Sequence, residues 1–278
     1  MDETFTWGER RMIEFSGRTL YQTDEGGGTH RVHIERGIVH VAPTVAFDID
    51  FGFLRIKSAT ATTSMGIGQD IEVIYEASGP VSAEGLIDLE TIVFPLEAKA
   101  GLVSISGTLT ATVRLGYQHE AQSAMTTRQS IGANGTITSG GTFTPSGQSW
   151  ETLWSTEYEG EVSTDDYVGE GWRGRVWIEI ESVIHLDNIE GSYSRYEPSL
   201  NGWAESDCET LAWGVSGGIS GATVLELGFF DDGPRTETMP ALNIEVDSEQ
   251  KERAHTVAPP GCGDPDPEPG TDPMFPLG

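Results

Sequence analysis

The stretch TVAFDIDF, residues 44–51, alternates between apolar and polar side chains. In an extended chain its four apolar residues at odd positions point to one side, while Ala46, Asp48 and Asp50 point to the other. This period of two predicts a β-strand with one face in a hydrophobic core and one face in solvent.

Seven other runs are rich in β-branched and aromatic residues and also predict strands. They are Phe53–Ala61, Asp70–Ala77, Gly85–Phe94, Val103–Tyr117, Gly135–Phe143, Arg175–His185 and Ala222–Phe230. Turns are predicted at clusters of Gly, Asn, Asp, Ser and Pro, namely at residues 26–28, 66–68, 78–80, 134–135, 140–141 and 231–234. We therefore expect an all-β fold: an antiparallel, jelly-roll-like β-sandwich with long strands and at most one or two short helices.

Residues 32–41, VHIERGIVHV, predict a hairpin. A two-residue turn at Arg36-Gly37 would pair Ile34 with Val39 and give both strands one apolar face. The same register places His33 directly opposite His40 on the other face.

Four parts are expected along the chain. They are an N-terminal segment with the hairpin (1–42), a main β-sandwich (43–246) with two sub-sheets dividing near 118–150 as an alternative, a short helix or linker (247–258) and a Pro/Gly-rich extended tail (259–278). The helix rests on Asp247 as N-cap and Gln250 completing a capping box. The tail holds half of the 14 prolines and cannot pack a core, so it is expected to lie along a neighbouring chain. Its expected contact residues are Pro265, Pro267, Pro269 and Phe275.

Charge is the unusual feature of the composition. The chain has 44 acidic and 16 basic residues, a formal net charge of −28, and its only lysines are Lys57, Lys99 and Lys251. Such self-repulsion is screened at molar salt, which favours a salt-loving source. The alternatives are a secreted protein of an ordinary marine microbe and a protein that is simply acidic. Nucleic acid and anionic membranes are poor partners, because no basic patch can neutralise phosphates.

Cysteine content and hydropathy add little about the compartment. Cys208 and Cys262 are the only cysteines, so they form one candidate disulfide, with two free thiols as the alternative. No run of 18 apolar residues predicts a transmembrane helix. Residues 1–11 lack the apolar core of a signal peptide, so either a leader was removed or export does not use that route.

Two glycine-rich stretches match catalytic or nucleotide-binding motifs, but the residues after them do not predict the helix that each motif requires. Gly214-Val215-Ser216-Gly217-Gly218 matches a nucleophile elbow, but its continuation reads as a loop and then a strand, where the elbow needs a helix. Residues 169–174 match the Gly-x-Gly-x-x-Gly of dinucleotide sites, but a strand follows there too.

Glu179 and Glu181 are weak catalytic candidates. They share one face of a predicted strand beside Trp177, about 6.5–7 Å apart along the backbone, and side chains can close this to the ~5 Å of a retaining glycosidase. The pair resembles the catalytic strand of β-jelly-roll glucanases, whose pattern is Glu-x-Asp-x-x-Glu. The aspartate and third acid are absent here, and two acids on a solvated strand face are the simpler interpretation.

Metal ligands are suggested by two further sets of residues. They are His33 and His40 with nearby His30 and Glu35, and the acidic loop pairs Asp165-Asp166 and Asp231-Asp232. The histidine pair offers two ligands where a stable zinc site needs three or four. The loops lack EF-hand spacing and suit only weak, exchangeable divalent cations, so no cofactor is expected.

Six of the seven tryptophans fall in the second half, where they would form a carbohydrate platform, a subunit contact or core. They are Trp150, Trp154, Trp172, Trp177, Trp203 and Trp213. Asn134-Gly135-Thr136 is the sole N-glycosylation acceptor triplet. With no complete catalytic set, we expect a structural protein: a capsid, turret or tail component of a virion, or a cell-surface protein, joined to its own copies or other subunits through β-edges and the tail. A secreted carbohydrate-binding or glycan-processing sandwich is the alternative.

Overall fold

The computed structural model describes residues 2–24, 28–52, 55–100, 103–144, 149–164, 171–187, 193–207, 210–225 and 235–252. Within them the chain forms thirteen strands and no helix. The strands are β1 (Asp2–Gly8), β2 (Arg11–Glu14), β3 (Thr19–Thr23), β4 (His30–Gly52), β5 (Arg55–Ala77), β6 (Val81–Ala100), β7 (Val103–Ala121), β8 (Met125–Thr144), β9 (Ser149–Thr164), β10 (Trp172–Leu186), β11 (Tyr193–Ser206), β12 (Thr210–Leu225) and β13 (Arg235–Glu252).

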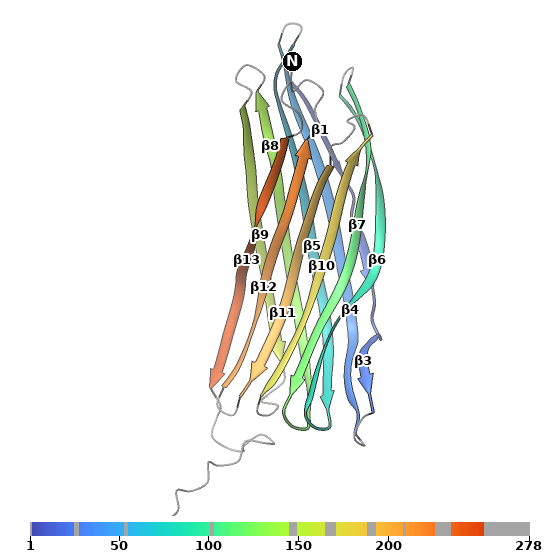
Figure 1. Ribbon diagram of the computed structural model, residues 1–278, viewed down its shortest axis with the longest axis vertical. Coiled ribbons are helices and arrows are strands. Elements are labelled where there is room, and N and C mark those ends of the chain that lie inside the picture. The colour runs from blue at the N-terminus through green and yellow to red at the C-terminus, as the bar shows by residue number, and fades with distance from the viewer. Residues whose placement is uncertain are drawn as a thin grey trace, which may run out of the picture.

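The strands form two antiparallel sheets packed face to face, which confirms the expected all-β sandwich (Figure 1). Sheet A has the order β1-β4-β5-β8-β9, with β2 and β3 also paired to β4. Sheet B has the order β13-β12-β11-β10-β7-β6, so its last four strands in sequence form a meander.

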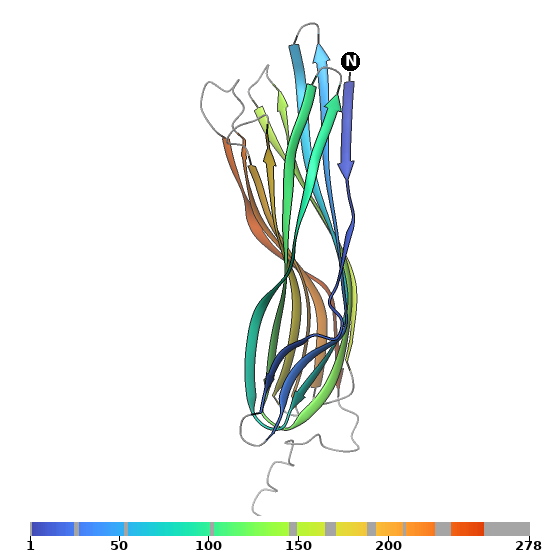
Figure 2. The same cartoon turned by 90° about the vertical axis from the view of Figure 1, so that its right-hand side faces the viewer.

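The molecule is a slender rod because its strands run almost its whole length (Figures 1 and 2). β4 and β5 have 23 residues each, which at a rise of about 3.3 Å per residue corresponds to ~75 Å. Figure 2, which looks onto the edge carrying β1 and β6, shows the two layers twisting about the long axis.

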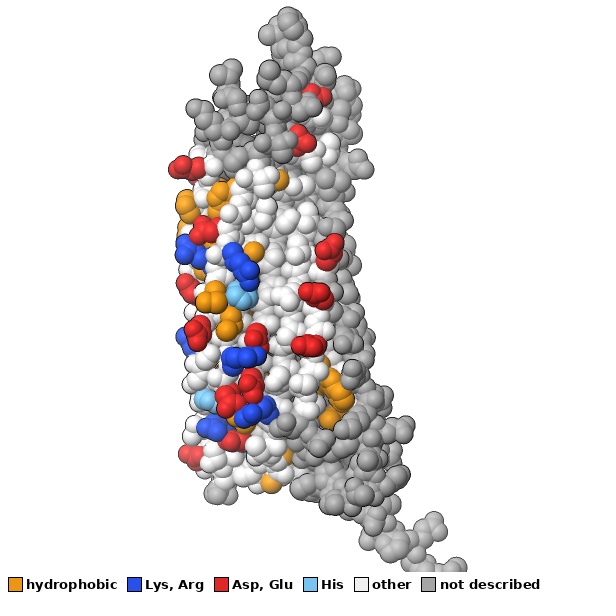
Figure 3. Space-filling view, turned by 180° about the vertical axis from the view of Figure 1, so that it is seen from behind, with side chains coloured by type: hydrophobic (Ala, Val, Ile, Leu, Met, Phe, Trp, Pro, Cys, Tyr) orange, Lys and Arg blue, Asp and Glu red, His pale blue; other side chains and the backbone are white. Residues whose placement is uncertain are grey.

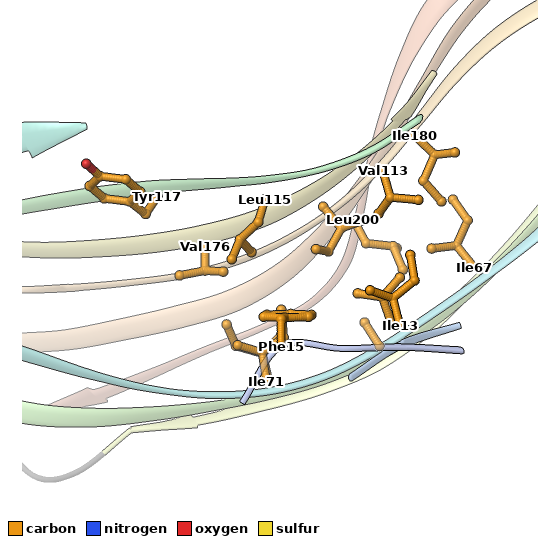
Figure 4. Close-up of a cluster of buried hydrophobic side chains, with 14 of the residues drawn as sticks. Ile13, Phe15, Ile67, Ile71, Val113, Leu115, Tyr117, Val176, Ile180 and Leu200 are labelled. Atoms are coloured by element: carbon orange, nitrogen blue, oxygen red, sulfur yellow. The ribbon is translucent and has the colours of Figure 1, made fainter. Parts of the chain in front are cut away.

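Alternating burial holds the sheets together. Along β5 the inward side chains of Ile67, Ile71 and Val73 are buried, while their neighbours face out. They meet inward residues of sheet B such as Val113 and Leu115 in one continuous core (Figure 4). Fully burying an aliphatic side chain contributes about 1.5–3 kcal/mol, so this core is the main source of stability.

The predicted hairpin at residues 32–41 is wrong. β4 runs unbroken from residue 30 to 52, and its register with β5 shifts between Ile34 and Arg36. This bulge inserts one extra residue, so burial moves from Val32 and Ile34 to Val39 and Val41. A hairpin and a bulge both move the apolar residues from even-numbered to odd-numbered positions, so the local sequence does not distinguish them.

The connection between β2 and β3 holds this bulge in place. The amide of Phe15 donates to the carbonyl of Gly37 at 2.9 Å, and the amide of Gly17 donates to that of Ile34 at 2.8 Å. Gly17 has a φ of 75°, a left-handed conformation that glycine adopts without strain. The ring of Phe15 lies over Gly37, where an added Cβ would be 2.4 Å from a ring carbon.

Three predicted turns lie inside strands instead. Residues 66–68 belong to β5, and residues 134–135 and 140–141 belong to β8. Glycine serves there to make room: a Cβ at Gly68 would lie 2.6 Å from Oδ1 of the cross-strand neighbour Asn134. The turn at residues 78–80 is present, between β5 and β6.

The expected helix from Asp247 is not formed over residues 247–252, which are the end of β13 and pair with β12. Pairing along a neighbouring strand overrides a weak capping signal. β4 also continues across residue 42, so the N-terminal segment is part of sheet A. The chain crosses between sheets after β5, β7 and β9, so no single division separates them.

Replacing Gly37 with alanine should destabilise the protein by about 1–3 kcal/mol, because the new methyl group would overlap the ring of Phe15. Gly79→Ala is the matched control, since no atom lies within 4 Å of its Cβ position, and we expect a change within about 0.5 kcal/mol. Urea unfolding measures both. Equal effects would show that the bulge is not held by this contact.

Candidate interaction surface

One lateral margin of the rod brings the edges of both sheets together. β1 of sheet A lies beside β6 of sheet B, and the rings of Trp7 and Phe94 meet edge to face with centroids 6.0 Å apart. We call the surface formed by β1, β2 and β6 the β6 margin.

All the exposed large hydrophobic residues of the described chain lie on this margin. Leu86 and Val93 of β6 are 48% and 58% exposed, and Met12 of β2 is 61% exposed. Other large apolar side chains on the outer face of sheet B, such as Trp177 and Trp203, are only partly exposed. Seen from behind, sheet A carries most of its apolar and charged side chains along the margin side, beside a broad uncharged area (Figure 3).

β6 is a long edge strand: it pairs with β7 along its length, and no described strand pairs with its other side. Its register shifts between Asp88 and Glu90, so Leu89 is a bulge residue. The bulge brings both Leu86 and Val93 onto the outer face of sheet B. Exposed acids (Glu84, Asp88, Glu90 and Glu97) and Pro95 limit uncontrolled pairing of this edge.

Glu181, one of the two catalytic candidates, lies on the outer face of sheet B within a network of ion pairs. Arg114 of β7 approaches its carboxylate at 2.9 Å and Arg195 of β11 at 2.8 Å. The two arginines also pair with Asp88 at 3.2 Å and Glu197 at 2.8 Å. This network links β6, β7, β10 and β11 and compensates the charge of Glu181.

Glu179, the other candidate, belongs to a separate chain of hydrogen bonds. Its carboxylate accepts a hydrogen bond of 2.7 Å from Nε1 of Trp177. The guanidinium of Arg175 lies over that indole, 4.9 Å from the ring centroid. Arg175 donates to Asn201 at 2.6 Å, and Asn201 donates to Ser216 at 2.7 Å. Burial lowers the pKa of Arg175, and nearby Glu179 opposes this shift.

The bonds of Arg175 and Asn201 therefore cross-link β10, β11 and β12, while the bond between Trp177 and Glu179 lies within β10. The indole lies over Gly116, where a Cβ would be 2.0 Å from a ring carbon. Ser216 lies within β12, a continuous strand, and not in the predicted loop. Trp203 is partly exposed on the same outer face, directly opposite Arg175.

The structure does not bring His33 and His40 together. They lie seven residues apart on β4, about 23 Å along the strand, because the hairpin that would pair them is absent. Nδ1 of His33 is 3.2 Å from the hydroxyl of Thr19. Burial lowers the pKa of His40, and the positive charge of Arg10 lowers it further. The negative charge of Asp70 opposes this shift. Among the described residues no group of three His, Cys, Asp or Glu side chains is arranged to hold a metal ion.

Several predicted site residues lie outside the described residues. They are Asp165, Asp166, Asp231, Asp232, Cys208, Cys262, Pro265, Pro267, Pro269 and Phe275. The side chains of Trp150 and Trp154 are also outside the description. Asn134 is exposed within β8, and Trp172 is buried in the core.

Sequence reasoning missed a buried polar cluster between the sheets. Tyr75 of β5 lies with its ring centroid 5.3 Å from His119 and 5.7 Å from Trp172, and its hydroxyl donates to Gln129 at 3.1 Å. All four residues are at most 2% exposed, and His119 Nδ1, Trp172 Nε1 and Gln129 Nε2 have no hydrogen-bond partner. Each of these residues falls at an inward position of its strand, and that alternation is the only signal in the sequence that could have located the cluster.

A scan against protein-family models, a search of curated proteins and a search of solved structures each returned no match for this chain. No helix in the described part of the chain is long and apolar enough to span a bilayer.

The buried cluster predicts that stability falls in mild acid. Burial lowers the pKa of His119 to about 4, and the charge of His30 adds to this shift. The hydrogen bond to the backbone carbonyl of Glu76 acts in the opposite direction and raises the pKa. An unfolded histidine has a pKa near 6.5, so the unfolded chain alone gains this proton as pH falls from 6.5 to 4. The stabilisation present above pH 6.5 should shrink by about 3 kcal/mol across that range.

Urea unfolding of wild type and His119→Leu at pH 7 and pH 4.5 measures this effect, because the other titrating groups are common to both proteins. The variant should lose less stability on acidification, while a His185→Asn control at an exposed histidine should behave as wild type. Identical losses in wild type and His119→Leu would contradict the prediction.

Proposed function

We propose that this protein is a non-enzymatic structural subunit of an assembly, a virion or cell-surface component of a salt-loving microbe that binds its own copies. The single observation that carries the proposal is the β6 margin. Every exposed large hydrophobic side chain of the described residues is on it, next to an edge strand of 20 residues. Exposed apolar side chains gathered beside an unpaired edge are typical of subunit contacts.

The arrangement of charges supports a structural role. Several arginines of the described chain form cross-strand pairs, for example Arg31 with Glu76 at 2.8 Å and Arg173 with Glu205 at 3.1 Å. Exposed pairs of this kind each contribute only about 0–1 kcal/mol, but they consume the positive charge. The remaining acids repel neighbouring copies in dilute buffer, and molar salt screens that repulsion to a length of roughly 3 Å.

Light scattering of the full chain in about 0.1 M and 3 M KCl tests the proposal, with the Debye length short only in the latter. We expect a particle of several 30.0 kDa chains at high salt and a smaller species at low salt. A monomer under both conditions would contradict the proposed assembly role.

Truncation after residue 258 tests the contribution of the tail, which is proposed to reach a neighbouring copy. The truncated chain should form a smaller or weaker particle at high salt. If it assembles as the full chain does, the tail is not a contact, and the assembly proposal then stands on the β6 margin alone.

Carbohydrate binding is a second candidate, favoured by one observation. Trp177 and Trp203 are diagonal neighbours on the outer face of sheet B, with Arg175, Asn201 and Glu179 beside them. Partly exposed indoles flanked by polar groups suit the faces of neutral sugar rings.

Native affinity gels containing soluble neutral polysaccharides test this candidate. Trp203→Ala should reduce retardation about tenfold, matching the ~1.4 kcal/mol of a lost stacking contact. The Glu179→Gln/Glu181→Gln double variant should still bind, because neither carboxylate stacks on the sugar. Free migration of wild type through every polysaccharide would remove the candidate, and hydrolysis lost only in the double variant would instead support an enzyme.

A further inference from the structure

β6 carries a pattern that suits pairing with itself. Its outer face exposes Ser82, Glu84, Leu86 and Asp88 before the bulge, and Thr91, Val93, Pro95 and Glu97 after it. Up to Asp88 the even-numbered residues point outward, and from Thr91 onward the odd-numbered residues do, because the bulge at Leu89 lies in the middle of this series. A two-fold axis between Leu89 and Glu90 would therefore map each half of the strand onto the other half in a second copy, with outer residues opposite outer residues.

We propose that two copies of this chain join through antiparallel pairing of residues 86–93 of β6, with Leu86 opposite Val93 of the second copy. This inference rests on the proposed assembly function and names its first contact. Inward residues match as well, since Ile87 falls opposite Ile92, both directed to the core side. Sheet B would then continue across the dimer as one sheet of twelve strands.

The exposed apolar side chains cover one another in this register. Leu86 and Val93, 48% and 58% exposed in the single chain, meet twice, once on each side of the axis. Directly opposite residues of an antiparallel pair have Cβ atoms about 4.5–5.5 Å apart, which is contact distance for two aliphatic side chains.

Charges are placed so that acids do not directly face acids. Asp88 lies opposite Thr91, Glu84 opposite Pro95 and Glu97 opposite Ser82 of the second copy. Shifting the register by two residues in one direction would place Glu84 opposite Glu97. The like charges nearest the axis are the two Glu90 carboxylates, so pairing strengthens as salt screens them.

Features that shelter the rest of the edge lie outside the pairing segment. Pro95 has no N–H to donate, and the contact between Trp7 and Phe94 brings β1 beside β6 just beyond Val93. The bulge lies on the two-fold axis, so both copies bend there in the same way. No described strand pairs with the outer side of β6 over residues 86–93.

Cysteine cross-linking tests the register, in the full chain with Cys208 and Cys262 replaced by serine. A mixture of Leu86→Cys and Val93→Cys proteins, oxidised in about 3 M KCl, should give a disulfide dimer containing one chain of each. Each variant alone should cross-link at least tenfold less, because its own cysteines would be about 23 Å apart across the axis. Efficient self-cross-linking of Leu86→Cys would overturn the register.

Charge substitutions test the surface. Leu86→Asp/Val93→Asp should weaken self-association by a factor of at least ten at high salt. Ala124→Asp, at an exposed position between β7 and β8 and outside the β6 margin, should leave it unchanged. Unaltered unfolding midpoints confirm that both variants fold.

Two failures are distinguishable. If wild type assembles but neither the β6 substitutions nor the mixed cysteines have an effect, the β6 contact is wrong and the assembly function stands. If wild type remains a monomer in high salt, both proposals fall.

Discussion

Two sheets that bury alternate residues along their full length are the constraint on which the rest of this molecule depends. Because successive side chains of a strand point to opposite faces, an error of one residue would turn an entire apolar series toward solvent. β4 and β6 each absorb one extra residue in a bulge, next to Ile34 and at Leu89. The bulges keep Val32 and Val39 of β4, and Ile87 and Ile92 of β6, directed inward on both sides. The connection through Phe15 and Gly17 stabilises the first of these bulges.

The outer faces follow from the same geometry. They carry the acidic excess, and cross-strand partners use the arginines, as in the network of Asp88, Arg114, Glu181 and Arg195. In the proposed assembly, neighbouring copies would therefore present mostly negative surfaces to one another, and molar salt would screen that repulsion. On this surface the apolar side chains of the β6 margin are the exception, and they carry the proposed function.

The interior is not uniformly apolar. At one end of the rod His119, Tyr75, Gln129 and Trp172 bring polar atoms into the core, several of them without a hydrogen-bond partner. Each such atom costs about 1–3 kcal/mol, so the apolar core along the rest of the rod has to offset the cost of this cluster. The acid sensitivity predicted for His119 therefore lies in a region separate from the β6 margin.

By itself the sequence determined the fold class and the charge character, because a period of two and an excess of acids are local or additive properties. Stretches such as residues 44–51 and 70–77 were enough to predict strands, and the side-by-side position of Glu179 and Glu181 followed from their spacing. Tertiary structure alone decided what each irregularity meant. The change of parity at residues 32–41 is a bulge and not a hairpin, because the pairing of β4 with β5 and the support of Phe15 lie far from it in sequence. The same holds for the interaction surface: Leu86, Val93 and Met12 came to share one margin only when β6 of one sheet lay beside β1 of the other. Strand order is a property of long-range packing that local periodicity does not encode.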